Sequence, residues 1–236
     1  MTRRRWIADE VSGSLAALMG AHAEHLSRVL RARVGQEFDI STDQGVRRGR
    51  ITSIHEDRIE FELGEEVPAA TELPVTLALS VFKFDRIEWA IEKCTELGVK
   101  RIVPVIASRT EAHLAAAATK RVERWRRIAR EAAEQSRRAH SPDIVEPLKL
   151  GKILEMESDL RIVLAEFNAS TSLKEALQNA AGRSILIAIG PEGGWTDAEH
   201  QAFTETGWIA ASLGGTILRA ETAAMAAMAV VVAELG

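Results

Sequence analysis

The sequence of 236 residues lacks tyrosine and contains a single cysteine, Cys94. One cysteine can form neither an internal disulfide nor a cysteine-based metal cage, and this scarcity fits a reducing compartment. The sequence also lacks any run near the roughly 18 to 20 apolar residues of a membrane-spanning helix. Its charged start, MTRRRWIADEV, differs from a signal peptide. We therefore expect a cytoplasmic protein with no membrane segment, and we expect Cys94 to lie in the core.

An excess of positive charge is also missing, because 30 basic residues stand against 34 acidic ones and the formal net charge is -4. This balance argues against a uniformly basic coat for nucleic acid, although local clusters of Lys and Arg suffice to bind phosphate. Arginine supplies 23 of the 30 basic residues, and its planar fork suits contacts to phosphate. The arginines gather at residues 3–5, 28–33, 47–50 and 121–138. Each cluster taken alone could equally be a solvated surface.

The first part of the chain has the pattern of a small β-rich module. Residues 37–63 alternate polar and apolar side chains around a turn, which is typical of half-buried strands. Before them, residues 22–35 show helical spacing of the apolar residues Leu26, Val29 and Leu30. Gly35 suits the end of that helix. Residues 64–74, with two prolines and three glutamates, form the expected linker.

From residue 75 onward, apolar segments alternate with amphipathic ones. We expect strands at residues 75–81, 101–107, 161–166, 184–190 and 209–214. We expect helices at residues 85–98, 120–136, 172–180, 196–207 and 221–235. Asp85 and Glu88 resemble a capping pair for the first of these helices. Strands that alternate with helices predict an α/β fold with a mostly parallel sheet covered on both faces.

One loop of this region is rich in glycine. The string IGPEGGW, at residues 189–195, leaves a predicted strand and enters a helix with the capping box Thr196 to Glu199. Glycines permit close approach of backbone amides to a ligand. The spacing matches neither the dinucleotide fingerprint nor a P-loop, so neither a nicotinamide cofactor nor a nucleoside triphosphate is favoured. A tight turn without a ligand is the alternative from local sequence.

A second unusual loop, residues 213–222, leads into an Ala- and Met-rich helix that ends at Leu235. Arg219 and Glu221 are charged in an otherwise apolar stretch, and burying either one without a partner would be costly. We expect them to contact each other, a ligand or a partner chain. A salt bridge that only fixes the loop is the alternative. The helix has little polar face, which predicts burial on all sides, by the sheet or by a second subunit.

Four strings, in one order between residues 84 and 230, carry a specific resemblance. They are EWAIEKCTELGV with IVPVIASR, EAAEQSRR with a following P-x-I, IGPEGGWTDAE, and LGGTILRAETAAMAAM. This set is similar to the RsmE family of ribosomal RNA uracil-N3 methyltransferases. The strings RRRWIADEV and HLSRVLRARVG resemble the N-terminal RNA-binding module of that family. The resemblance implies a PUA-like β-barrel at residues 1–70, a trefoil-knotted SPOUT methyltransferase domain at residues 74–236, and a homodimer with the active site at its interface.

The resemblance also implies a reaction and roles for single residues. The enzyme would transfer a methyl group from S-adenosylmethionine to N3 of a uridine in 16S ribosomal RNA of the small ribosomal subunit, without a metal. Arg219 would lie beside the methyl group and the uracil. Our own hypothesis is that Arg219 stabilises charge on a uracil oxygen and that Glu221 orients Arg219. The cofactor would be lined by Leu164, Ala165, Glu166, Ile189, Gly190, Pro191, Glu192, Gly193, Gly194, Leu213, Gly214, Ile217, Leu218 and Thr222. RNA would be held by Arg3, Arg4, Arg5, His25, Arg28, Arg31, Arg33, Arg109, Gln135 and Arg137.

Other functions fit less of the sequence. Another SPOUT enzyme, acting on transfer RNA or a ribose hydroxyl, could use the same two loops, but the arginine-rich N-terminal segment favours the ribosomal substrate. A non-catalytic RNA-binding or ribosome-assembly factor is disfavoured by the intact glycines and Arg219. A nicotinamide oxidoreductase lacks its phosphate fingerprint. Arg137 and Arg138 stand where the family often has a small residue, which leaves the RNA contact there open, and the aromatic candidates for base stacking are Trp6, Trp195 and Trp208.

Overall fold

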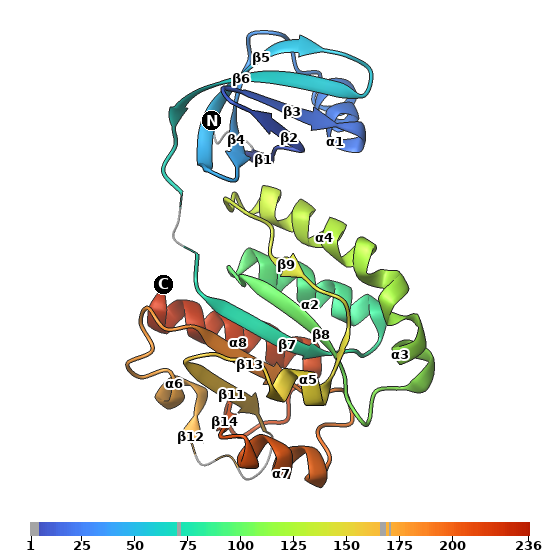
Figure 1. The fold of residues 1–236 in the computed structure, drawn as a ribbon, viewed down its shortest axis with the longest axis vertical. Helices are drawn as coiled ribbons and strands as arrows, with labels where there is room; N and C mark the ends of the chain where they lie inside the picture. Colours follow the sequence, from blue (N-terminus) through green and yellow to red (C-terminus); the bar gives the residue numbers. More distant parts are fainter. Residues whose placement is uncertain (1–4, 70–71, 166–168, 170) are drawn as a thin grey trace. The chain divides into compact units, whose positions relative to one another are not determined.

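The computed structural model describes residues 5–69, 72–165, 169 and 171–236, so the predicted site residues Arg3, Arg4 and Glu166 lie outside the described residues (Figure 1). The chain divides into two compact units. The first comprises Met1–Thr71 and Ala133–Ser141, and the second comprises Glu72–Ala132 and Pro142–Gly236. Each unit has a sheet and a core of its own.

In the described part of the first unit, six strands form a curled sheet in the order β1-β4-β5-β6-β3-β2 (Figure 1). Neighbouring strands are antiparallel except for the parallel pair of β1 and β4. The alternation in residues 37–63 is confirmed, since its apolar side chains lie in the core of this unit. Gly49 is required by close packing, because a Cβ there would lie 2.3 Å from Cγ1 of Ile40. The strands are β1 (Arg5–Ile7), β2 (Glu10–Ser12), β3 (Leu15–Met19), β4 (Glu37–Thr42), β5 (Gly45–Ile54) and β6 (Arg58–Glu66).

The helical segment before β4 differs from the prediction. It consists of α1 (Gly20–Glu24) followed by a π-helical turn, η1 (His25–Val29), and it ends before Arg31, whose φ is 52°. A π-helical turn has i→i+5 hydrogen bonds and therefore more residues in each turn, so a residue three positions further on no longer shares the face of the first. Leu26 is therefore buried, whereas Val29 and Leu30 are 64% and 45% exposed. The predicted linker also begins later than residue 64, because β6 continues through Glu66.

In the described part of the second unit, eight strands form a sheet whose main path is β10-β8-β7-β13-β11-β14-β12, with β9 beside β8. Every pairing described in this sheet is parallel, which confirms the predicted parallel sheet. The strands are β7 (Val75–Ser80), β8 (Arg101–Ile106), β9 (Asp143–Ile144), β10 (Leu148–Lys149), β11 (Leu160–Leu164), β12 (Thr171–Ser172), β13 (Ile185–Ile189) and β14 (Ile209–Ser212).

The helices of this region follow the predicted order with two additions, α3 and α5. They are α2 (Phe84–Glu96), α3 (Ala112–Ala118), the 3₁₀ turn η2 (Thr119–Arg121), α4 (Val122–Gln135), α5 (Leu150–Leu154), α6 (Leu173–Ala176), α7 (Asp197–Glu205) and α8 (Ala220–Leu235). The predicted capping pair of α2 is wrong. Lys83 is the N-cap residue, and among the described residues no side chain caps this end. Glu88 instead accepts a hydrogen bond from Nε of Arg124 at 2.6 Å.

Two apolar layers cover the two faces of the parallel sheet, as predicted. Along β13, Ile185, Ile187 and Ile189 face one layer, while Leu186 and Ala188 face the other. The period of two along a strand produces this division. Helices α2 and α8 contribute to the first layer and α7 contributes to the second. A strand that is buried on both faces has an unbroken apolar sequence, as residues 185–189 do.

Helix α8 is buried along one side only. Its inner side chains, Ala224, Ala227, Met228 and Val231, are fully buried, and the helix packs against α2, α6 and β13. Ala229, Val232 and Ala233 are exposed on the other side. The predicted burial of α8 on all sides is therefore present on one side only within this single chain. Among the described residues, none of the helices combines the length and apolar character needed to cross a membrane.

Candidate active site

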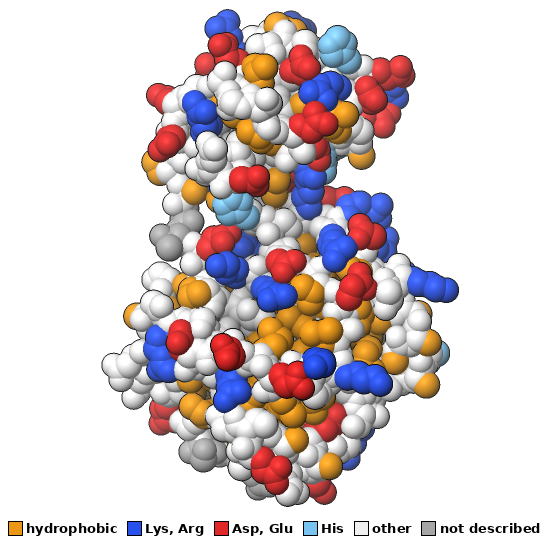
Figure 2. All heavy atoms as spheres, in the orientation of Figure 1, with side chains coloured by type: hydrophobic (Ala, Val, Ile, Leu, Met, Phe, Trp, Pro, Cys, Tyr) orange, Lys and Arg blue, Asp and Glu red, His pale blue; other side chains and the backbone are white. Residues whose placement is uncertain are grey.

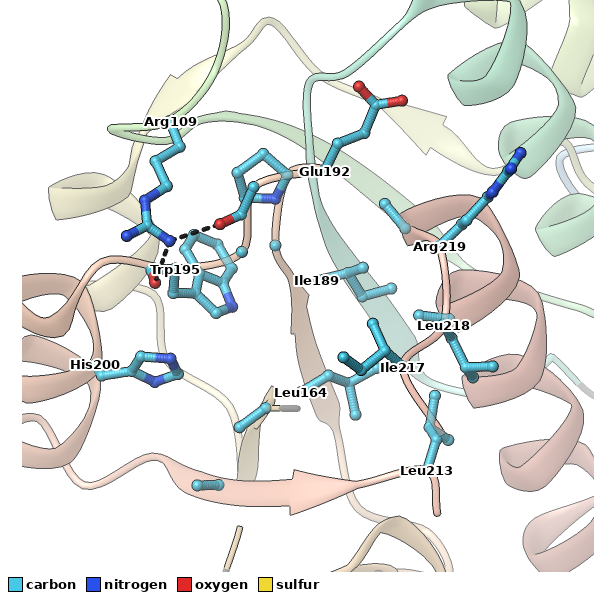
Figure 3. Close-up of a pocket in the computed structure, with 18 of the residues that line it drawn as sticks. Arg109, Leu164, Ile189, Glu192, Trp195, His200, Leu213, Ile217, Leu218 and Arg219 are labelled. Carbon is cyan, nitrogen blue, oxygen red and sulfur yellow. Dashed lines mark hydrogen bonds between the residues drawn. The ribbon is translucent and has the colours of Figure 1, made fainter. Parts of the chain in front are cut away.

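A cavity of about 1130 Å³ lies in the second unit at the carboxyl ends of its strands. It is formed where the segments after β11, β13 and β14 meet the start of α8 (Figure 3). Open α/β sheets bind ligands at this edge, because the loops that follow the strands diverge there. Figure 3 shows aliphatic side chains on one side of the cavity and Arg109, Trp195 and His200 on the opposite side.

The glycine-rich loop between β13 and α7 forms one wall. Its turn is closed by a hydrogen bond from the Gly194 N–H to the Pro191 carbonyl at 2.8 Å, and Gly194 has a φ of 67° that favours glycine. At Gly190, a Cβ would come within 3.2 Å of Nε1 of Trp195, so the indole packs directly against this backbone. The predicted capping box is confirmed, since Thr196 Oγ1 accepts from the Glu199 N–H at 3.2 Å and Glu199 Oε2 accepts from the Thr196 N–H at 2.8 Å.

The segment between β14 and α8 forms the wall that carries Arg219. Arg219 is the N-cap residue of α8, and its carbonyl accepts a hydrogen bond from the Ala223 N–H at 2.8 Å. Its side chain is exposed and lines the cavity. Within the described residues, its guanidinium makes no hydrogen bond or ion pair, and Figure 3 shows it extending from the start of α8. The guanidinium is therefore available to a ligand.

Glu221 lies behind this wall and does not line the cavity. It is only 3% exposed, and its Oε1 accepts a hydrogen bond from Nη1 of Arg86 on α2 at 2.9 Å. Its Oε2 is buried without a hydrogen-bond partner among the described residues. Side chains two residues apart at a helix start face different directions, and the ion pair described for Glu221 is therefore with Arg86 rather than with Arg219.

Arg109 reaches the cavity from the turn after β8. Its Nη1 donates to the Gly193 carbonyl at 2.6 Å and to the Trp195 carbonyl at 3.3 Å (Figure 3). The resemblance assigned Arg109 to RNA, whereas the structure directs its guanidinium toward the glycine-rich loop.

The predicted cofactor residues converge on the cavity. Of those that the structure describes, all line it except Thr222, which is half-buried in the first turn of α8. Sequence reasoning missed several further lining residues: Lys83, Arg86, Trp195, Asp197, His200, Gln201 and Thr204. One signal could have found the first two, since Lys83 and Arg86 follow the carboxyl end of β7. His200 lines the cavity because of how α7 packs, which local sequence does not disclose.

The arginines predicted to hold RNA differ in exposure within the first unit. Arg5 is 4% exposed. Its Nη1 donates to the Arg137 carbonyl. Burial lowers the pKa of its guanidinium, and nearby Arg137 adds to this while Asp39 opposes it. Arg28 is exposed and paired with Glu24 and Glu56, and further exposed residues are Arg31 and Arg33.

Three further residues that were predicted to hold RNA, His25, Gln135 and Arg137, also belong to the first unit. His25 is half-buried with its ring centroid 5.9 Å from that of Trp6, Gln135 is exposed, and Arg137 pairs with Asp39 at 3.3 Å. On the face drawn in Figure 2, basic and acidic side chains are interspersed. Of the three aromatic candidates for stacking, Trp6 and Trp208 are buried in the cores of their units, and Trp195 lines the cavity. Trp89, which was not a candidate, is 49% exposed.

Comparison with known proteins assigns the chain to a family. A family model described as an RNA methyltransferase domain matches residues 69–232. The ribosomal RNA small subunit methyltransferase E of Bacillus subtilis is 31% identical over 226 residues, which cover 91% of this chain and 88% of that protein. This chain belongs to the ribosomal RNA small subunit methyltransferase E family. The protein of that name from a Synechocystis species is 34% identical over 228 residues, covering 94% of this chain and 74% of its own length.

The likeness to this family extends to the fold. A crystal structure of a ribosomal RNA small subunit methyltransferase E from Neisseria gonorrhoeae, bound to S-adenosyl methionine, superimposes with a TM-score of 0.88 at 30% identity. The match covers 100% of this chain and 99% of that one, so it includes both units. Membership in the ribosomal RNA small subunit methyltransferase E family confirms the resemblance to RsmE, and it makes this chain an RNA methyltransferase.

Proposed function

We propose that this chain transfers a methyl group from S-adenosylmethionine to N3 of a uridine in 16S ribosomal RNA of the small ribosomal subunit. The observation that carries the proposal is Arg219, a cation with no protein partner among the described residues, at the cavity bounded by the glycine-rich loop. The names of the relatives support a ribosomal RNA substrate, which a bacterial cell holds in its cytoplasm. The ligand of the Neisseria gonorrhoeae protein supports the cofactor.

The residues of the cavity fit S-adenosylmethionine chemically. Leu164, Ile189, Ile217 and Leu218 offer aliphatic surface for an adenine ring, and the backbone of residues 190–194 offers polar groups with little steric hindrance. When bound, S-adenosylmethionine supplies an electrophilic methyl group on a sulfonium. The donor set of the cavity thus combines apolar walls with polar backbone groups, as a nucleoside ligand requires.

The side chains of this site would act mainly by alignment and charge stabilisation. Methyl transfer proceeds in line, so the site has to hold the uracil N3 on the axis of attack and favour loss of the N3 proton. Arg219 would donate hydrogen bonds to a uracil oxygen on which negative charge develops. Glu221 would act as a positioning residue, because its pair with Arg86 fixes the first turn of α8, which follows Arg219.

The finer features of the architecture form part of the same proposal. The first unit would be the PUA-like RNA-binding domain, with Arg28, Arg31 and Arg33 exposed for phosphate contacts. The buried Arg5 would support that surface from within. The second unit would carry the trefoil knot and form the homodimer. The exposed apolar side of α8, at Ala229, Val232 and Ala233, supports a second copy as the group that covers it.

The test uses 30S subunits from cells that lack the modification. The subunits are incubated with the protein and radiolabelled S-adenosylmethionine, and the RNA is digested and analysed by mass spectrometry. Label in 3-methyluridine is the expected result, and the Arg219→Ala protein serves as the control that should transfer little label. Label in a ribose-methylated nucleoside would contradict the assigned atom. Tight cofactor binding without any label would favour a non-catalytic RNA-binding role.

A further inference from the structure

The turn at residues 107–110, between β8 and α3, contacts the glycine-rich loop through the side chain of Arg109. Nη1 of Arg109 donates to the carbonyls of Gly193 and Trp195, at 2.6 Å and 3.3 Å. Hydrogen bonds from a charged donor are stronger than those between neutral groups. One side chain therefore fixes two carbonyls of a loop that contains three glycines, and glycine residues have the greatest freedom to leave a given conformation.

The carbon stem of Arg109 also packs on this loop. A Cβ built at Gly193 would lie 3.3 Å from Cδ of Arg109 and 3.5 Å from its Cβ. A Cβ at residue 193 would therefore push the stem away by a few tenths of an ångström. The glycine thus has a packing reason that is separate from any contact with a ligand.

A second contact ties the same turn to the start of α7. The Ser108 N–H donates to Glu199 Oε1 at 2.8 Å, while Glu199 Oε2 accepts from the Thr196 N–H at 2.8 Å. The 107–110 turn is itself closed, because the Thr110 N–H donates to the Ala107 carbonyl at 3.1 Å and Thr110 Oγ1 accepts from the Ala107 N–H at 3.1 Å. Adjacent residues of one closed turn therefore hold both the loop and the helix that follows it.

We propose that Arg109 is a positioning residue for the cofactor loop, and that its main role is to preorganise residues 190–195 for S-adenosylmethionine rather than to bind RNA phosphate. The inference rests on the proposed function, since it assigns that cavity to S-adenosylmethionine. Without Arg109 the loop samples more conformations, and binding has to order it again. The ordering lowers affinity for the cofactor, because part of the binding free energy is then used to fix the loop.

Isothermal titration with S-adenosylmethionine tests the proposal on the full-length protein. Arg109→Ala is expected to weaken cofactor binding by about tenfold, the effect of losing one to two charge-assisted hydrogen bonds. The KM for S-adenosylmethionine should rise by a similar factor, whereas kcat at saturating cofactor should change by less than about threefold. Binding of an unmodified ribosomal RNA fragment, measured without cofactor, should stay within about twofold of wild type.

The matched control is Arg127→Ala on α4, which removes an arginine that is 63% exposed and does not line the cavity. Its cofactor affinity should equal that of wild type. The proposal is overturned if Arg109→Ala keeps wild-type cofactor affinity, whether or not its RNA affinity falls. If Arg109→Ala fails to fold, Arg109→Lys decides by the same criterion, since a lysine keeps the charge but has a shorter reach, and an intermediate loss is expected. Wild-type protein that binds no S-adenosylmethionine would instead contradict the proposed function.

Discussion

Arg86 on α2 donates its Nη1 hydrogen to Glu221 on α8, at 2.9 Å, across 135 positions of the chain. The pair links the first turns of two helices that both border the cavity. Glu221 therefore pairs with Arg86 instead of Arg219, and the Arg219 guanidinium has no protein partner among the described residues. The two charges that looked like a pair in the sequence therefore have separate tasks in the structure.

The first prediction concerns Arg219. Arg219→Ala should lower the rate of methyl transfer by about 100-fold or more, because donors aimed at a developing oxyanion have effects of that size. Cofactor affinity should change little, since the guanidinium is expected to act on the uracil. Single-turnover assays with saturating S-adenosylmethionine measure the first quantity and calorimetry the second. A variant with wild-type turnover would show that another group stabilises the charge.

The pair of Arg86 and Glu221 should contribute to stability. Arg86→Ala leaves a nearly fully buried carboxylate without its ion-pair partner, and we expect the free energy of unfolding to fall by about 2 kcal/mol. Replacing both residues, as Arg86→Met with Glu221→Leu, should recover most of this loss because no buried charge remains. Urea unfolding of the three proteins checks the expectation. Equal losses in the single and double variants would mean that the ion pair itself is not the cause.

Glu199 should make the stability of the second unit depend on pH in the acid range. Burial favours the neutral form of its carboxyl, but hydrogen bonds from the Ser108 N–H and from the Thr196 N–H and hydroxyl outweigh it, so the pKa of Glu199 lies below its ordinary value of 4.5. A lowered folded-state pKa stabilises the fold above the unfolded pKa, and this contribution is lost as pH falls through the folded pKa. Glu199→Gln should therefore reduce the loss of stability below about pH 4.5.

Melting temperatures measured between pH 3 and pH 7 test this dependence. Glu60→Gln is a suitable control, because the pKa of Glu60 is also lowered, by Ser53 and Arg58, but the residue lies in the first unit. Only Glu199→Gln should change both the cofactor affinity and the fall in melting temperature at acid pH. If the melting temperatures of wild type and Glu199→Gln fall identically at acid pH, the role assigned to these hydrogen bonds is contradicted.

Cys94 should be inert in the folded protein. Its side chain is fully buried on the inner side of α2, and burial raises the pKa of the thiol to about 12. Thiolate is the reactive species, so a group that is both buried and neutral reacts slowly. A thiol reagent at pH 8 should label native protein at least about 100-fold more slowly than protein in urea. Fast labelling of the native state would mean that the layer opens readily.

Much of the parallel sheet could be predicted because its signals are local. The apolar run of β13 and the period of α2 each arise within one element, and both appear in the structure close to their predicted bounds. The two-residue strands β9, β10 and β12 were missed because two residues cannot display a period. The N-terminal helix was misjudged for a different reason. Its π-helical turn changes which side chains share a face, and nothing in the residue types announces that change.

The candidate site divides in the same way. The glycines at 190–194 and the charges at Arg219 and Glu221 stand out within a few residues of sequence, so the two loops were found. The partner of Glu221 was not, because Arg86 reaches it only through the packing of α2 on α8. The contact of Arg109 with Gly193 depends on the same kind of distant packing. Local sequence identifies where the site lies, and tertiary structure decides which groups face it.

The fit between Arg109 and Gly193 also constrains how this family can vary. A Cβ at 193 would lie 3.3 Å from Cδ of Arg109, so the arginine stem would have to shift by a few tenths of an ångström, and a larger side chain would crowd it further. Two positions 84 apart in the chain are therefore expected to be exchanged together when relatives diverge. A relative that has lost the arginine has also lost the constraint, and its loop is free to evolve a bulkier residue at the position of Gly193.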